Sequence, residues 1–371
     1  MDRVCYLCQE LPPDGDWSLE HIIPNALGGR WKSRSLLCRV CNSTTGSEID
    51  AALCREVGWP MNMMGLTRER KPVPKQVVTL PDGSEYLRDA QGRLWPRHAI
   101  GYEQLDGNQV TLSIQARNRR EARAKLREYE KKYPGKIDVE QFMSSLTETV
   151  QPHRSPVNFT SSGVGSSAAL RAVAKIAANA FIEWGGLPDQ IMECISFIRG
   201  ESSRQLVRWY YVDEVWPDRG DMDVTHVVAL RAGAPGEGLW GYVELFRIYR
   251  FAVQLSAAHK GPIVHRDYVY DIGQKRVVTD AQPVFSPGAL DLEDGGVDLE
   301  AIRAVGSHMM RIAEWRSLEA SFGEAIGKAF TEAVAANPNA TTEDLLRHLH
   351  TYLDPVLLAV IQAGVRRDGS R

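Results

Sequence analysis

Hydrophobic residues recur along this chain with two different periods. Residues 168–185, "AALRAVAKIAANAFIEWG", would place apolar residues around most of the circumference of a helix, and they end in glycine. This pattern predicts a helix buried in a core. Further along come short strand-like runs, several of which alternate apolar and polar positions, as half-buried antiparallel strands do. These runs are "QLVRWYYV", "DVTHVVAL", "WGYVELFR", "RFAVQLS" and "YVYDI".

The rest of the chain beyond residue 60 predicts mixed structure. "MNMMGLTRERKPVPK" is typical of a linker, whereas "VVTLPDGSEYLRDAQGRLWP" and "NQVTLSIQARN" predict strands. "RREARAKLREYEKKY" predicts a charged helix with a solvated face, and contact with a nucleic-acid backbone is the alternative. Two more helices are expected near 297–336 and 342–365. The predicted fold class is therefore α+β.

Residues 1–60 have shorter elements. "WSLEHIIP" predicts a short strand that ends at Pro24, and "NALGG" a turn in which Gly28 and Gly29 are free to take positive φ. "SLL" predicts a second strand, and "CNSTTGSEIDAALC" predicts a helix. The inner face of that helix is expected to carry Ile49, Ala52 and Leu53. The predicted order is strand, turn, strand, helix.

Four of the six cysteines form two Cys-x-x-Cys pairs around these elements, Cys5 with Cys8 and Cys38 with Cys41. Disulfides are a poor explanation in a reducing compartment. The spacing instead suits tetrahedral zinc, with a redox pair or buried free thiols as the alternatives. Zinc with four protein ligands has no open position, so we expect a structural ion rather than a catalytic one.

Length and composition limit the classes of protein to consider. A chain of 371 residues exceeds one typical domain, so we expect domains at 1–60 and 61–371. The hydrophobic fraction of 43% and charged fraction of 25% are those of ordinary globular proteins. No apolar run approaches the length of a membrane span, and "MDRVCYLC" lacks the apolar core of a signal peptide. We therefore expect a cytoplasmic protein without membrane contact.

The net charge of -3 identifies no partner, but charge is unevenly distributed. Residues 21–47 contain four basic side chains and no acidic one. Such a patch suits phosphate contacts, with a solvated surface as the alternative. The candidate phosphate-binding residues are Arg30, Lys32, Arg34 and Arg39.

The order Cys-x2-Cys, Glu-His, Cys-x2-Cys-Asn, with the phrases "EHIIPNALGG", "LLCRVCN" and "GSEID", resembles the HNH or ββα-metal endonuclease superfamily in its four-cysteine zinc branch. The resemblance covers residues 1–60. It implies that His21 is the general base, and that Glu20 and Asn42 coordinate a catalytic Mg²⁺ or Mn²⁺. It also implies that the cysteine pairs hold structural zinc.

Elementary chemistry agrees with these implied roles. Histidine suits activation of water near neutral pH, and a hard cation with oxygen ligands stabilises charge on a phosphodiester. The chain departs from the common pattern in two places. Ser33 and Ser35 stand where many members have a structural asparagine, and we expect their hydroxyls to support the loop. Asp50 lies eight residues after Asn42, where we expect helix packing or capping, with a weak or indirect role at the metal as the alternative.

These observations predict a metal-dependent endonuclease that hydrolyses DNA. The region 61–371 is much larger than the nuclease segment, so we expect it to regulate, target or oligomerise the nuclease. Its expected partners are a nucleotide second messenger or a partner protein, as in the anti-phage HNH effectors with a similar layout. Two alternatives stay open: a non-catalytic zinc module that binds nucleic acid, and a ligand-sensing or partner-binding defence protein with the nuclease as its output.

Overall fold

The computed structural model describes residues 4–12, 15–106, 109–145, 165–234, 236–287 and 299–368. They form two compact units, and each combines segments that are distant in the sequence. The first unit comprises Met1–Val73 and Ser161–Trp315, and the second comprises Pro74–Thr160 and Arg316–Arg371. Helices and antiparallel sheets occur in both units, which confirms the α+β class. The boundary expected at residue 60 stays a prediction.

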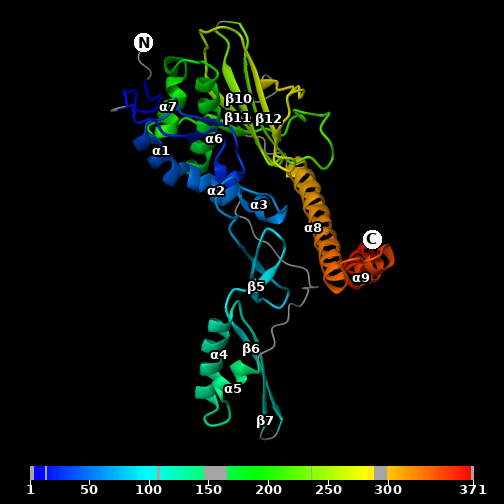
Figure 1. Cartoon of the computed structure of the whole chain (residues 1–371). Coiled ribbons are helices and arrows are strands. Elements are labelled where there is room, and N and C mark those ends of the chain that lie inside the picture. The colour runs from blue at the N-terminus through cyan, green and yellow to red at the C-terminus, as the bar shows by residue number, and fades with distance from the viewer. Residues whose placement is uncertain are drawn as a thin grey trace. The chain divides into compact units, whose positions relative to one another are not determined.

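The first unit is built on a six-stranded antiparallel sheet with the order β13-β12-β9-β10-β11-β8 (Figure 1). Five of its strands overlap the strand-like runs predicted from the sequence, and β13 was not predicted. The strands are β8 (Val207–Trp209), β9 (Thr225–Ala232), β10 (Leu239–Leu245), β11 (Tyr249–Ser256), β12 (Val264–Asp271) and β13 (Arg276–Val277).

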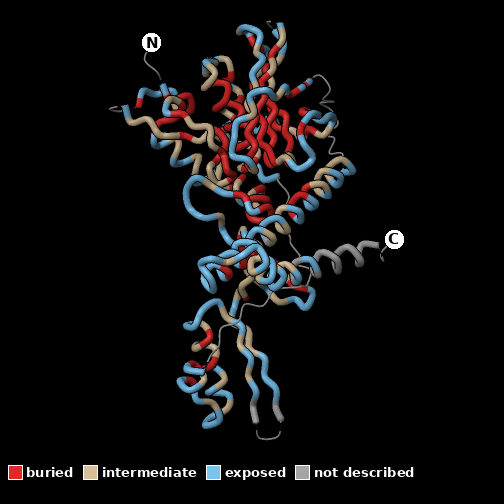
Figure 2. Tube along the Cα trace, turned by 45° about the vertical axis from the view of Figure 1, so that its right-hand side comes forward, coloured by how far each residue is buried: buried red, intermediate tan, exposed pale blue. Residues whose placement is uncertain are grey.

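The central strands are buried on both faces, which corrects the expectation of half-buried strands (Figure 2). Helices α6 (Ser167–Glu183) and α7 (Met192–Arg199) pack against one face. An aromatic cluster packs on the other face and covers strand residues such as Val227, Ala229 and Ala252. Its largest members are Tyr210, Trp216, Tyr242 and Phe285.

Helix α6 is the buried helix predicted at 168–185. Ser166 caps its start, because the Ser166 hydroxyl accepts from the Ala169 amide at 3.1 Å. Alanines along the helix permit a close approach to the sheet. A Cβ on Gly241 of β10 would lie 2.9 Å from the Ala177 Cβ, so glycine is required where helix and strand meet.

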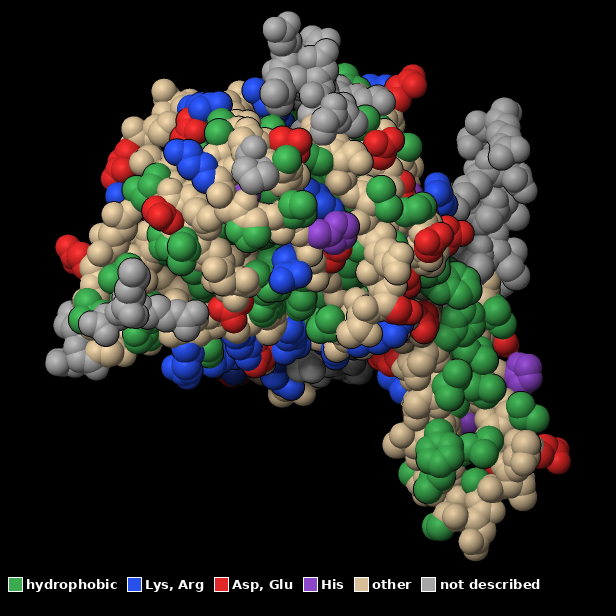
Figure 3. All heavy atoms as spheres, turned by 90° about the horizontal axis from the view of Figure 1, so that it is seen from above, with side chains coloured by type: hydrophobic (Ala, Val, Ile, Leu, Met, Phe, Trp, Pro, Cys, Tyr) green, Lys and Arg blue, Asp and Glu red, His purple; other side chains and the backbone are tan. Residues whose placement is uncertain are grey.

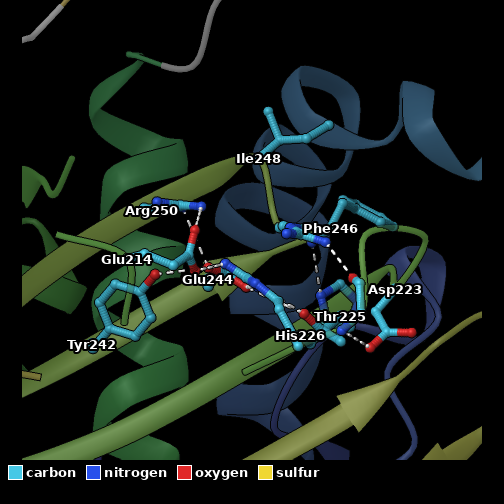
Figure 4. A network of polar contacts seen from close by, with 12 residues as sticks. Glu214, Asp223, Thr225, His226, Tyr242, Glu244, Phe246, Ile248 and Arg250 are labelled. Atoms are coloured by element: carbon cyan, nitrogen blue, oxygen red, sulfur yellow. Dashed lines mark hydrogen bonds and ion pairs between the residues drawn. The ribbon is translucent and has the colours of Figure 1, made fainter. Parts of the chain in front are cut away.

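Three charged side chains of the first unit, Arg219, Glu244 and Arg250, are buried and form a network with the exposed Glu214 (Figure 4). Glu244 accepts from Arg219 and, at 2.8 Å, from the Tyr242 hydroxyl. Arg250 also pairs with Glu244, and it donates to Glu214 at 2.7 Å. Burial opposes ionisation of Glu244, but Arg219 and Arg250 hold its pKa at about 2. The network is structural, because each charge in it faces an opposite charge.

The first 73 residues form small elements at the edge of this core. Strand β1 (Glu20–His21) pairs with β2 (Lys32–Ser33), followed by helices α1 (Arg39–Thr45), α2 (Ala51–Val57) and α3 (Trp59–Met63). A π-helical turn, η3 (Gly46–Asp50), joins α1 to α2. The helix predicted after the second cysteine pair is confirmed, and Ile49, Ala52 and Leu53 are buried as expected.

The second strand begins earlier than predicted. "SLL" is not a strand, because Leu36 and Leu37 bond to loops: their carbonyls accept from the amides of Tyr6 (3.2 Å) and Ser18 (3.0 Å). The hydroxyls of Ser33 and Ser35 lie 2.9 Å apart, so they support this loop as expected.

The Gly-Gly turn depends on both glycines, each for a different reason. Gly28 has φ of 86°, the left-handed region that favours glycine. Gly29 does not have positive φ, but an added Cβ there would lie 2.0 Å from the Ile23 carbonyl oxygen. The turn follows the 3₁₀ helix η2 (Asn25–Leu27) and brings the chain back from β1 to β2.

The segment expected to be a linker is packed in its first half. Met61, Met63 and Leu66 are buried in the same core cluster as Ile176 of α6. Leu53 of α2 belongs to that cluster too, and α2 contacts α6 directly (Figure 1). Residues 1–73 therefore share one hydrophobic core with the sheet domain.

The second unit contains small sheets and helices. Strands β3, β4, β5 and β7, helix α4 and the two later helices appear where the sequence predicted strand and helix material, whereas β6 and α5 were not predicted. Charged residues on the exposed face of α4 form ion pairs, such as Arg123 with Glu140 and Lys132 with Glu103. The elements are β3 (Gln76–Thr79), β4 (Glu85–Arg88), β5 (Leu94–Pro96), β6 (Ile100–Asp106), β7 (Gln109–Gln115), α4 (Arg119–Lys132), α5 (Val139–Ser144), α8 (Leu299–Ala336), which begins in the first unit, and α9 (Thr342–Asp368).

Among the described helices, none combines the length and apolar character needed to cross a membrane.

Candidate functional site

The four paired cysteines converge on one point. Their sulfur atoms all lie within 4.8 Å of one another, and those of Cys8 and Cys38 are 3.9 Å apart. Zinc–sulfur bonds of about 2.3 Å place the corners of a tetrahedron about 3.8 Å apart, so the cluster fits zinc. Cys38 also caps α1, since its sulfur accepts from the Cys41 amide at 3.4 Å. The cluster therefore fixes the start of the helix that carries Asn42.

The three residues with implied catalytic roles line one open pocket of about 500 Å³. Glu20 and His21 come from β1, and Asn42 comes from α1. Residues of η2 and of the turn from η3 into α2, including Asp50, complete the lining. The structure thus brings Glu20, His21 and Asn42 together, although their chemical roles stay a prediction.

The Glu20 carboxylate is almost fully buried, with 4% of the residue exposed. Its Oε1 atom lies 2.7 Å from the Lys175 ammonium and accepts from the Asn179 amide nitrogen at 3.0 Å. Both partners belong to α6. Burial raises the pKa of Glu20, and the charge of Lys175 opposes that rise.

Lys175 bridges two carboxylates. Its ammonium also donates to Asp50 Oδ2 at 2.6 Å. Burial alone would lower the pKa of Lys175, but Asp50 and Glu20 raise it above its ordinary value. Asp50 thus makes an ion pair, and its side chain caps no helix. The sequence carried no signal for Lys175 or Asn179, since both lie in an otherwise apolar helix.

His21 is held by a carboxylate from a third segment. Its Nε2 atom lies 3.3 Å from Glu69 Oε2, and Glu69 also pairs with Lys32. These two partners hold the pKa of Glu69 at about 2, so Glu69 is ionised at neutral pH and can only accept. Nε2 therefore carries the proton, and Nδ1 carries the lone pair. Glu69 lies in the segment that the sequence presented as a linker.

Asn42 is oriented by the loop that precedes β1. Its Nδ2 group donates to the Ser18 hydroxyl at 2.7 Å. The carbonyl oxygen of the same amide is then left to accept or to ligate. Asn42 lines the pocket beside Glu20, and the role of this oxygen as a neutral metal ligand, which the family resemblance implies, stays a prediction.

Two of the four candidate phosphate-binding side chains have acidic partners. Lys32 pairs with Glu69, and Arg39 pairs with Asp16, with Arg39 Nη2 and Asp16 Oδ1 2.7 Å apart. Arg34 is exposed and Arg30 is half-buried. On the face of the molecule in Figure 3, basic and acidic side chains are interspersed. Phosphate contact by these residues stays a prediction.

The loop beside the pocket is anchored to the sheet through His226. Its Nε2 atom donates to the Leu27 carbonyl oxygen at 2.8 Å. Its Nδ1 atom accepts from the Phe246 amide at 3.3 Å (Figure 4). Accepting at Nδ1 requires a neutral ring. Burial lowers the pKa of His226 to about 4, in agreement with that neutral form.

Comparison with known proteins identifies the N-terminal segment. Residues 5–57 match the sequence model of a family described as HNH endonuclease. Together with the four-cysteine cluster, this match fits a zinc-binding HNH module, and it supports a nuclease-type function with nucleic acid as substrate. No curated protein and no solved structure matches the chain.

Proposed function

We propose that this chain is a metal-dependent endonuclease that hydrolyses phosphodiester bonds of DNA. The observation that carries the proposal is the meeting of Glu20, His21 and Asn42 in one pocket of a zinc-clamped HNH module. A module that only bound nucleic acid would not need an imidazole and two oxygen ligands beside one another.

The donor set suits a hard divalent cation. Asn42 offers a neutral carbonyl oxygen, and Glu20 offers the carboxylate oxygen that its partners on α6 leave unbonded. Mg²⁺ and Mn²⁺ prefer such oxygen ligands and keep several waters. When bound, the cation would neutralise charge on the phosphate and on the departing oxygen.

His21 is the general base in this proposal. With Nε2 bonded to Glu69, the Nδ1 lone pair removes a proton from water as the water oxygen attacks phosphorus. Burial lowers the pKa of His21, which keeps the ring neutral and able to accept near pH 7. Glu69 then stabilises the imidazolium that forms.

Control by the rest of the chain is part of the proposal. It is supported by α6, which lies beyond residue 160 and yet bonds to a pocket residue. The nucleotide or protein effector and the role in anti-phage defence, both expected from the family resemblance, stay predictions.

A plasmid-cleavage assay with Mg²⁺ or Mn²⁺ tests the proposal. His21→Ala should lower the cleavage rate by roughly 10²–10⁴-fold, the usual contribution of general-base catalysis. Zinc content and DNA binding should stay near normal, because His21 is no zinc ligand. His265→Ala, at an exposed histidine in β12, is the matched control. A loss below tenfold in His21→Ala would refute the assignment, and DNA binding without any cleavage by the unaltered chain would favour the non-catalytic alternative.

A further inference from the structure

Helix α6 presents two polar side chains to the buried side of the nuclease pocket. Lys175 and Asn179 are one helical turn apart, so they lie on the same face. Lys175 is 1% exposed and Asn179 is fully buried. Burying an ammonium and an amide is costly unless both are bonded. Both side chains bond to Glu20, which gives this face of the helix a purpose beyond packing.

These contacts hold one carboxylate oxygen of Glu20 and leave its other carboxylate oxygen without a hydrogen bond from α6. Lys175 and Asn179 both contact Glu20 Oε1, at 2.7 and 3.0 Å. Among the described residues, none donates a hydrogen bond to Oε2. The Tyr6 hydroxyl donates to Asn179 Oδ1 at 2.6 Å, which turns the amide nitrogen of Asn179 toward Glu20. Asp50 holds the other side of the Lys175 ammonium at 2.6 Å.

We propose that Lys175 and Asn179 are positioning residues that hold Glu20 by Oε1 so that Oε2 is presented to the catalytic cation. The inference rests on the proposed function, in which Glu20 is a cation ligand. Groups that hydrogen-bond to a metal ligand commonly set its orientation and its affinity. Here they come from a segment more than 150 residues away, so the pocket of the HNH module is completed by the sheet domain.

The charges are consistent with this role. Glu20, Asp50 and Lys175 together carry one net negative charge, so the site still attracts a cation after Lys175 is counted. Without Lys175 the two carboxylates would repel each other. The opposite role is that the Lys175 ammonium competes with the cation for Glu20. If Lys175 competes in this way, Lys175→Met should strengthen Mn²⁺ binding. Asn179→Leu should then leave Mn²⁺ binding unchanged, because Asn179 carries no charge.

Calorimetric titration of the full-length, zinc-loaded protein with Mn²⁺, in the absence of DNA, measures the Mn²⁺ affinity and distinguishes these roles. Lys175→Met and Asn179→Leu should each weaken Mn²⁺ binding by about 10–100-fold, the usual effect of losing a group that orients a ligand. Arg171→Met is the matched control on the same helix, since Arg171 bonds to the Ile198 carbonyl oxygen instead. It should bind Mn²⁺ like the unaltered chain. Zinc content and circular dichroism establish that each variant is folded.

Two outcomes overturn the positioning role: tighter Mn²⁺ binding by Lys175→Met, or unchanged binding by Asn179→Leu. Glu20→Gln separates this failure from failure of the proposed function. If Glu20→Gln binds Mn²⁺ normally, Glu20 is not a cation ligand. Its role in the proposed function and the positioning role of α6 are then both wrong. If Glu20→Gln weakens binding while Asn179→Leu does not, only the positioning role is lost. Should both α6 variants fail to fold, Tyr6→Phe removes a single hydroxyl from the same chain of bonds, and unchanged affinity in it overturns the inference.

Discussion

At the scale of single residues, Cys38 has two structural roles. Its sulfur belongs to the four-cysteine cluster, and it also accepts the Cys41 amide at the start of α1. Asn42 is the next residue of that helix, and its amide reaches Ser18 across the loop. The position of a candidate catalytic side chain therefore depends directly on the four-cysteine cluster.

We predict one zinc per chain, and loss of that zinc in Cys38→Ser together with unfolding of residues 5–57. Binding of structural zinc is worth enough free energy to decide whether small modules fold. Cys54→Ser is the matched control, because Cys54 lies outside the cluster. This variant should keep one zinc per chain. Metal analysis by mass spectrometry and circular dichroism measure both effects. Folded Cys38→Ser that retains one zinc would contradict the prediction.

Candidate site residues that occur in short-range patterns can be proposed from the sequence, whereas those supplied by distant segments cannot. Glu20, His21 and Asn42 could be proposed because they lie close to the two cysteine pairs, all within residues 5–42. Lys175 carries no such mark: one lysine in an alanine-rich helix usually extends to solvent. Its burial here requires two carboxylates from another segment, and only tertiary structure reveals that pairing.

At the scale of elements, the tight turn between β10 and β11 is joined to the pocket loop. Phe246 and Arg247 have φ of 58° and 64°, a region that costs a non-glycine residue roughly 1–3 kcal/mol. His226 of β9 stabilises the turn by accepting the Phe246 amide, and it donates to Leu27 at the end of η2. A neutral His226 thus holds the sheet and the pocket loop together.

Stability should fall as the pH drops below about 6.5. An unfolded His226 takes up a proton near its ordinary pKa, whereas the folded form resists protonation down to about 4. The unfolded state therefore binds more protons in this window, and the stability present above 6.5 is lost toward pH 4. Between pH 7 and 5.5 the loss should be about 1 kcal/mol.

Urea unfolding of the full chain at those two pH values measures the change. His226→Gln should reduce the loss by about that amount, since its side chain does not titrate. The exposed His265→Gln is the control and should keep the pH dependence of the unaltered chain. Equal pH dependence in His226→Gln and the unaltered chain would show that another group is responsible.

Most elements could be predicted, and the errors have a common cause. Periodicity located α6 and five of the six strands of the large sheet, because apolar residues recur regularly in these elements. The short strand β2 was misplaced, since two-residue pairing leaves no periodic signal and Leu36 and Leu37 are as apolar as a strand would be. The aromatic cluster that covers the second face of the sheet comes partly from irregular segments, such as Phe285, which no period announces.

At the scale of the whole molecule, the nuclease segment and the sheet domain share their interior. Leu53 and Val57 of α2 belong to the same core as Ala172 and Ile176 of α6. The Trp59 indole also donates to the Tyr249 hydroxyl at 2.6 Å, from α3 to β11. A family match that ends at residue 57 therefore marks the limit of a sequence pattern and not the edge of a hydrophobic core.

We predict that a fragment of residues 1–60 binds zinc but neither melts cooperatively nor cleaves DNA. Separation from α6 would expose the apolar side of α2, and so small a core needs more than one metal clip. It would also remove Lys175 and Asn179, which leaves Glu20 and Asp50 as neighbouring carboxylates without a cation between them. Thermal melting by circular dichroism and plasmid cleavage, each with equimolar zinc and the full chain as control, measure the two losses. A fragment that melts cooperatively and cleaves as fast as the full chain would show that residues 61–371 neither complete nor control the site.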